Sequence, residues 1–221
     1  MVVLANMQNL LNKITFVFTD KVLRQRIIFV LGALVVFRVL ATIPIPGIDA
    51  LRLEQFLTNN QFFGLLNIFS GGGLSNLSIV MLGVGPYITS SIIMQLLTIM
   101  VPALKKLYHE EGELGRRKFT QYSRLLTIPL ALLQGFGLLI LLERQGVIEH
   151  LDFFNSIINL AIITSGSILL MWIGELVSEF GIGNGVSIII FAGIVAVIPS
   201  QVGQLLFTFD VSQLPLYLAF I

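Results

Sequence analysis

The chain has 221 residues, of which 56% are hydrophobic and 11% charged, and its mean hydropathy is +0.94. A soluble domain carries roughly 25% charged residues, so this composition excludes a water-exposed globular surface and indicates a protein embedded in lipid. The net charge of +1 gives no general attraction to nucleic acid, and the lack of cysteine excludes disulfides and thiolate metal sites.

Five apolar segments are long enough to cross a bilayer, which takes about 20 residues. They are residues 27–43, about 77–101, 125–142, about 153–173 and about 186–206. Pro44 and Pro46 end the first segment. A sixth apolar run, 214–221, has barely begun when the chain stops, so we expect a fragment or one half of a larger protein. The predicted fold is an all-α, polytopic membrane helix bundle.

Three regions follow from this pattern. Residues 1–26 form an N-terminal segment in which Leu10, Ile14 and Val17 recur at helical spacing, which predicts an amphipathic helix on the membrane surface. The alternative is a solvated helix that awaits a partner. Residues 27–206 hold the five spans, and residues 207–221 form an outer loop with the start of a sixth helix.

The distribution of basic residues predicts the orientation of the chain. Ten lysines and arginines precede the first span or lie between spans two and three, whereas Arg52 and Arg144 alone lie on the other side. This bias predicts a cytoplasmic N-terminus. The loop predicted after span four carries Glu175 and Glu179, which contribute little to the rule.

No catalytic or metal-binding pattern stands out. His109 and His150 have no second ligand at metal spacing, so we expect no metal. The glycine run at 71–73 lacks the Gly-Lys-Ser/Thr of a phosphate-binding loop, and no G-x-S-x-G occurs. We therefore expect neither an enzyme nor a cofactor.

Arg38 is the one formal charge deep in a predicted span. A charge at the bilayer centre costs about 2.5 to 3.5 kcal/mol on insertion scales. The side chain therefore faces protein or a water-filled cavity, or else extends to the outer surface five residues away.

Residues 62–70 are apolar but too short to cross the membrane, and three glycines follow them. Consecutive glycines form a joint rather than a helix. Since irregular backbone at membrane depth must be buried or line a cavity, the pattern favours a short re-entrant segment hinged to the next span. A surface loop is the alternative.

Two long stretches resemble the signatures of the SecY family of protein-conducting channels. They are SIVMLGVGPYITSSIIMQLL at 78–97 and MWIGELVSEFGIGNGVSIII at 171–190. Three further stretches agree in order: FRVLATIPIPGID at 37–49, NIFSGGGLS at 67–75 and EEGELGRRKFTQYSR at 110–124.

The resemblance implies half of a ten-helix bundle built from two inverted five-helix repeats, with a mid-membrane ring of apolar side chains and a short plug helix at about 62–73. It assigns ring positions to Val84, Ile88, Val186 and Ile190. Each pair is spaced i, i+4 and so shares one helical face. The plug and its hinge would comprise Phe62, Leu65, Leu66, Ile68, Phe69, Gly71, Gly72 and Gly73.

The resemblance also makes spans two and three lateral-gate helices, through which membrane segments pass into lipid. Gln95 and Gln134 are gate candidates, or else simple interhelical hydrogen-bonding residues. A basic cytoplasmic loop would face SecA or the ribosome, and no other contact with nucleic acid is expected. Its residues are Lys105, Lys106, Arg116, Arg117 and Lys118.

The function implied is the passage of unfolded polypeptides, with their signal sequences, across a bacterial plasma membrane or a thylakoid-type membrane. The implied partners are the C-terminal half of the channel, SecE, SecG and the lipid bilayer; the half alone would not form a sealed channel and could pair with a second copy. A half of an inverted-repeat secondary transporter is the alternative, although such proteins usually carry intramembrane ionisable residues. A membrane scaffold without a pore is a third possibility.

Overall fold

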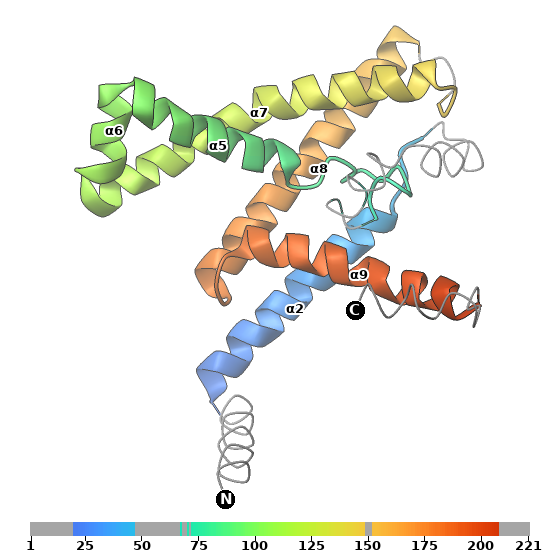
Figure 1. Cartoon of the computed structure of the whole chain (residues 1–221), viewed down its shortest axis with the longest axis horizontal. Helices are drawn as coiled ribbons and strands as arrows, with labels where there is room; N and C mark the ends of the chain where they lie inside the picture. Colours follow the sequence, from blue (N-terminus) through green and yellow to red (C-terminus); the bar gives the residue numbers. More distant parts are fainter. Residues whose placement is uncertain (1–19, 47–66, 68–69, 71, 149–151, 208–221) are drawn as a thin grey trace, which may run out of the picture.

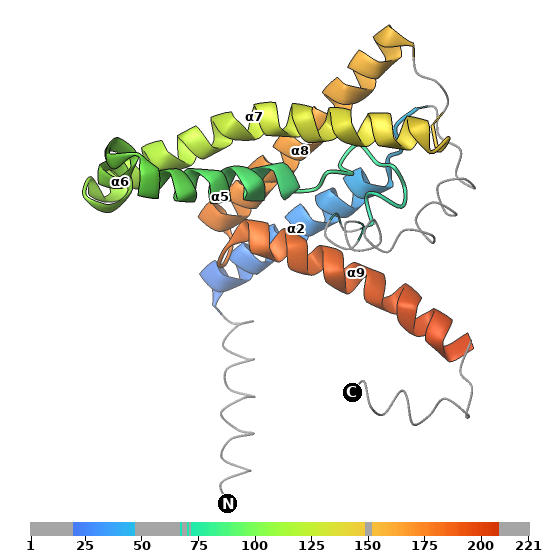
Figure 2. The same cartoon turned by 45° about the horizontal axis from the view of Figure 1, so that its top comes forward.

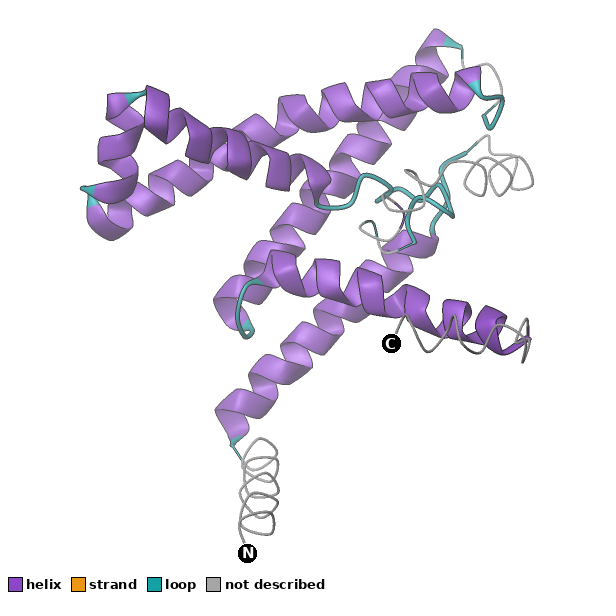
Figure 3. Cartoon of the chain, viewed as in Figure 1, coloured by secondary structure: helices purple, strands orange, loops and turns teal. Residues whose placement is uncertain are grey.

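The computed structural model describes residues 20–46, 67, 70, 72–148 and 152–207. Six helices make up most of this part (Figures 1 and 3). They are α2 (Lys21–Thr42), α5 (Gly85–Met100), α6 (Pro102–His109), α7 (Gly112–Arg144), α8 (Phe153–Phe180) and α9 (Gly185–Phe207). In this part of the chain the one extended pairing is an isolated bridge between Pro44 and Ser78, which confirms the all-α prediction.

Each of the five predicted spans overlaps a helix. Of these helices, α2, α7 and α8 are each long and apolar enough to cross a membrane. The pair α5 and α6 would make a fourth span, although the two are bent by 111° to one another, and the apolar part of α9, Gly185–Pro199, is shorter. The described residues thus contain three or four spans by length and composition, and a fifth stays a prediction.

The second helix begins later than the sequence predicted. The apolar segment starts near residue 77, but α5 starts at Gly85, because the chain before it forms turns. Leu77 and Gly83 have φ angles of 39° and 59°, in the left-handed region that a helix does not use. Pro86, whose ring fixes a helical φ and whose missing N–H needs no partner in the first turn, then marks the start of α5.

Two predicted loops are helical. The basic stretch 105–118 belongs to α6 and to the first turns of α7, which are separated by Glu110 and Glu111, and α7 begins at Gly112, whose φ is 63°. Glu175 and Glu179 lie on α8, which continues to Phe180. These predictions were wrong because hydropathy marks where the lipid-facing stretch ends, whereas a helix continues through polar residues until a glycine or proline stops it.

The helix α7 is long relative to a bilayer. Its 33 residues extend about 50 Å at 1.5 Å per residue, whereas the hydrocarbon core is about 30 Å thick. Helix α2 also extends beyond its predicted span, since it begins at Lys21 rather than at residue 27. Its N-cap is Asp20, whose side chain accepts from the Val22 amide at 2.8 Å. The predicted amphipathic helix falls on residues 1–19, which lie outside the described residues, as do residues 208–221.

The helices pack as two crossing layers. Helix α5 lies alongside α7, with α6 folded back against the first turns of α7, while α8 crosses α7 and contacts both α9 and α2 (Figures 1 and 2). Glycines permit the closest approaches of backbone: a Cβ on Gly166 of α8 would lie 1.9 Å from the carbonyl oxygen of Ile79, in the turns before α5. Small residues at such crossings let backbones approach where lipid supplies no hydrophobic driving force.

Candidate functional site

The four predicted ring residues lie in one apolar cluster. Val84 is buried at 2% exposure, and Ile88, Val186 and Ile190 are partly buried around it. The cluster also takes in Phe37 from α2 and Leu170, Ile173 and Val177 from α8. The structure therefore brings together side chains that lie about 100 residues apart in the sequence and come from the start of α5 and the start of α9.

Val84 and Ile88 keep the i, i+4 relationship of a helix although Val84 lies just before α5. Val84 is the N-cap of α5, and the Ile88 amide donates to its carbonyl oxygen at 3.1 Å. The second pair, Val186 and Ile190, lies within the first two turns of α9. Each pair therefore presents two aliphatic side chains from one face of a helix start.

The turn that carries Val84 is held by α8. The buried Ser167 hydroxyl donates to the Gly83 carbonyl oxygen at 3.0 Å, next to the close contact made by Gly166. Sequence reasoning missed this pair of residues. A Gly-Ser pair inside an apolar span is the signal that could have revealed it, since small and hydroxyl residues favour helix interfaces in membranes.

Most of the predicted plug falls outside the described residues. This applies to Phe62, Leu65, Leu66, Ile68, Phe69 and Gly71. Its neighbours Asn67 and Ser70 and the glycines Gly72 and Gly73 are described, and they form a hydrogen-bonded turn. The Gly72 amide donates to the Asn67 carbonyl at 2.9 Å, the Ser75 amide to Asn67 Oδ1 at 2.7 Å, and the Leu74 amide to Ser70 Oγ at 3.1 Å.

This glycine turn is attached to the end of α2. The Ile45 amide donates to the Leu77 carbonyl at 2.9 Å, and the Ile79 amide to the Ile43 carbonyl at 3.0 Å. Gly73 is packed tightly, because a Cβ there would lie 3.1 Å from the Ser70 carbonyl oxygen and 3.2 Å from that of Val80. The glycines thus form an anchored turn, and their role as a hinge stays a prediction.

Arg38 lines a cavity of about 370 Å³ between the end of α2, the glycine turn and α9. Asn67, Ser75 and Asn76 also line it, so the guanidinium shares the space with amide and hydroxyl groups. This position agrees with the first of the two expectations for Arg38, a side chain that faces protein or a water-filled cavity.

The two gate candidates differ in their surroundings. Gln134 on α7 is half-buried, and its amide nitrogen lies 3.5 Å from the Thr89 hydroxyl on α5, a long hydrogen bond between neighbouring helices. Gln95 on α5 is exposed. The Gln134 contact matches the role of an interhelical hydrogen bond, and a gating role for either residue stays a prediction.

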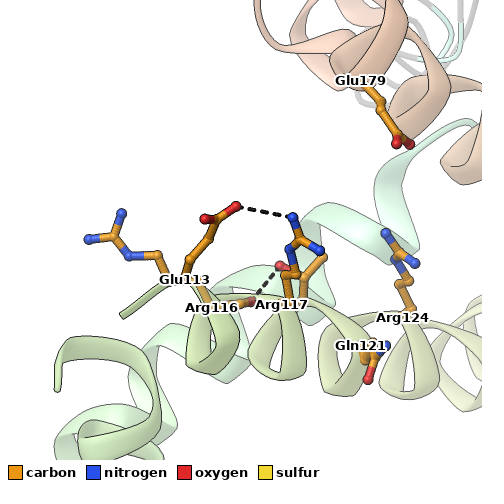
Figure 4. Close-up of a pocket in the computed structure, with 7 residues that line it drawn as sticks. Glu113, Arg116, Arg117, Gln121, Arg124 and Glu179 are labelled. Atoms are coloured by element: carbon orange, nitrogen blue, oxygen red, sulfur yellow. Dashed lines mark hydrogen bonds and ion pairs between the residues drawn. The ribbon is translucent and has the colours of Figure 1, made fainter. Parts of the chain in front are cut away.

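The five basic residues of the predicted partner loop are all exposed. Lys105 and Lys106 lie on α6, and Arg116, Arg117 and Lys118 lie on α7. A groove of about 510 Å³ runs along this part of α7 and reaches Glu179 on α8 (Figure 4). Within it, Arg117 pairs with Glu113 at 3.1 Å, both side chains being more than 70% exposed.

An ion pair between helices was also missed by sequence reasoning. The Arg124 Nε on α7 donates to the Glu175 carboxylate on α8, and the Glu175 side chain is 19% exposed. The error came from placing Glu175 in a loop. Elsewhere in the described residues, no group of three or more histidine, cysteine or acidic residues gathers in a way that could hold a metal ion.

The SecY family model matches residues 78–221. The chain belongs to the SecY family. Curated SecY relatives include the protein translocase subunit SecY of Buchnera aphidicola from Acyrthosiphon pisum, 45% identical over 188 residues, and that of Escherichia coli K12, 46% identical over 191 residues. Each alignment covers 82% of this chain, and the relatives are covered to 43% and 42%. The chain thus spans less than half the length of these SecY proteins.

Solved structures share the fold. Sec61 in the canine ribosome-channel complex from the endoplasmic reticulum matches with a TM-score of 0.59 and 22% identity, covering 81% of this chain and 38% of that chain. A structure described as that of a protein-conducting channel matches with the same values. The predicted resemblance to the SecY family is therefore confirmed, together with the channel fold.

Proposed function

We propose that this chain forms one half of a protein-conducting channel that passes unfolded polypeptides across a membrane and releases apolar segments sideways into lipid. The observation that carries the proposal is the single apolar cluster formed by Val84, Ile88, Val186 and Ile190. Curated relatives named as translocase subunits support it.

In this proposal the aliphatic cluster contributes half of a constriction. An apolar constriction blocks ions by dewetting, and it makes no specific hydrogen bond, so it suits substrates of varied sequence. The segment 62–70 would close the outer side, with the anchored glycine turn as its fixed end. Helices α5 and α7 would line the lateral exit.

The basic residues of α6 and of the start of α7 would face the cytoplasm, together with the N-terminus. Their charge suits an acidic surface of SecA or the RNA of a ribosome, and SecE, SecG and the C-terminal half of the channel would complete the assembly. The transporter alternative gains no support, since Glu175 in α8 is paired with Arg124 and so is poorly suited to ion coupling. No enzymatic step is proposed.

The proposal is tested by crosslinking. Because the chain has no cysteine, single cysteines at Ile88, Ile190 and Phe191 can be introduced without background. A polypeptide arrested during translocation through the assembled channel should crosslink to positions 88 and 190. It should not crosslink to position 191, which is 66% exposed and is not part of the apolar cluster. Crosslinks at position 191 with none at 88 and 190 would overturn the pore assignment.

A further inference from the structure

An ion pair joins two helices next to a ring residue. Arg124 of α7 donates to the Glu175 carboxylate of α8. Glu175 directly follows Gly174, where an added Cβ would lie 3.0 Å from Val186 Cγ2 on α9. The charge pair therefore lies one residue from the point where α8 meets a proposed ring residue.

The surroundings of the ion pair distinguish it from other charged contacts nearby. The Arg124 and Glu175 side chains are 42% and 19% exposed, and they join two helices 51 residues apart in the sequence. The Glu113–Arg117 pair lies within one helix, and its side chains are 81% and 73% exposed. Exposed pairs within a helix contribute little, whereas a partly buried pair leaves an uncompensated charge when one partner is removed.

Helix α8 connects the ion pair to the proposed constriction. Its Ser167 hydroxyl donates to the carbonyl oxygen of Gly83, directly before Val84. Leu170, Ile173 and Val177 of the same helix belong to the apolar cluster that takes in the ring residues. The placement of α8 therefore bears on the ring residues of both α5 and α9.

We propose that Arg124 and Glu175 are positioning residues, which hold α7 and α8 in register and, through the contacts of α8, set the placement of Val84 and Val186. The proposal rests on the proposed function for its link to the constriction. The geometric part, that a charge pair fixes the crossing of α7 and α8, stands on the contacts alone.

The test measures distances between spin labels on the whole chain in lipid vesicles. Labels are attached to cysteines at Tyr122 of α7 and Leu176 of α8, which are 48% and 45% exposed, and a second pair uses Ile92 of α5 with Leu176. In the unaltered chain each pair of labels should give a narrow distribution of distances. The distribution should broaden in Arg124→Glu and in Glu175→Arg, and it should become narrow again in the double variant, where the charges are exchanged. The matched control is Glu113→Arg and Arg117→Glu, which should leave both distributions narrow.

Unchanged distributions in the two single variants would overturn the proposal, as would a double variant that stays broad. If the reversed charges prevent insertion, Arg124→Gln and Arg124→Lys replace them. The glutamine variant should broaden the distribution and the lysine variant should not, and equal widths would overturn the proposal. These distances need no translocating polypeptide. A failed crosslink at Ile88 with intact distance behaviour would therefore reject the proposed function and leave the positioning role in place.

Discussion

Gly174 and Gly185 lie in backbone contact where α8 approaches the start of α9. A Cβ on Gly185 would lie 1.9 Å from the Gly174 carbonyl oxygen, and a Cβ on Gly174 would lie 3.0 Å from Val186 Cγ2. This contact places the first ring residue of α9 directly against α8.

Gly185→Ala should therefore destabilise the chain. The added methyl group meets backbone, which cannot rotate away, and overpacking of this kind costs about 1 to 3 kcal/mol. The measurement is the free energy of reversible unfolding in detergent micelles. Gly137→Ala in α7 is the matched control: nothing lies within 4 Å of its Cβ, so we expect no loss and a gain of up to about 1 kcal/mol from helix propensity. Equal losses for the two variants would contradict the packing argument.

Ser167→Ala should weaken the turn before α5. The variant removes the 3.0 Å hydrogen bond to the Gly83 carbonyl and leaves that buried oxygen without the donor, at a cost of about 1 to 2 kcal/mol. Faster amide hydrogen exchange at residues 83–88 is the readout. Ser165→Ala, on the same helix, serves as control because the exposed Ser165 hydroxyl bonds within its own helix to the Ala161 carbonyl. No difference in exchange between the variants would exclude the anchoring role of Ser167.

The regular parts of this fold were predictable because lipid imposes a simple rule on them. A stretch of about 20 apolar residues must satisfy its backbone internally, so helices at all five apolar segments follow from hydropathy. The resemblance also gave Val84, Ile88, Val186 and Ile190, which the structure gathers in one cluster.

What the sequence did not reveal depends on contacts between distant segments. The turns before α5 are stabilised by backbone hydrogen bonds with Ile43 and Ile45 and by close contact with Gly166, all of which lie far from these turns in the sequence. The Arg124–Glu175 pair was missed for the same reason, since its partners lie 51 residues apart and hydropathy placed Glu175 in a loop.

Polar substitution in the ring should raise ion leak through the assembled channel. Val186→Ser or Ile190→Ser adds hydroxyl groups that hydrate a constriction otherwise sealed by dewetting. The measurement is conductance in planar bilayers without a translocating polypeptide, and a several-fold rise is expected. Val195→Ser in the same helix is the control, because Val195 is 41% exposed and lies outside the apolar cluster. Equal conductance in ring and control variants would count against the pore.

Neutralising the basic residues of α6 and the start of α7 should weaken partner binding. Replacing Arg116, Arg117 and Lys118 by glutamine removes three exposed positive charges from the proposed cytoplasmic side. If the partner surface is ribosomal RNA, each lost phosphate contact should reduce the slope of log affinity against log salt by on the order of one unit. Arg144→Gln, at the opposite end of α7, should change neither the affinity for ribosomes or SecA nor its salt dependence. An unchanged slope in the triple variant would show that other surfaces carry the binding.

The length of α7 has a mechanical consequence. With 33 residues and Pro129 near its middle, the helix resembles a rigid rod with one compliant point about halfway along. Helix α6 is packed on one arm, near Gly115, and the apolar core around Leu139 and Leu142 holds the other. A sideways load on the α6 arm would bend the helix at the proline, while the apolar core keeps the far arm in place. Helix α7 therefore has the geometry of a hinged arm, whose α6 half can swing while its other half stays fixed in the core.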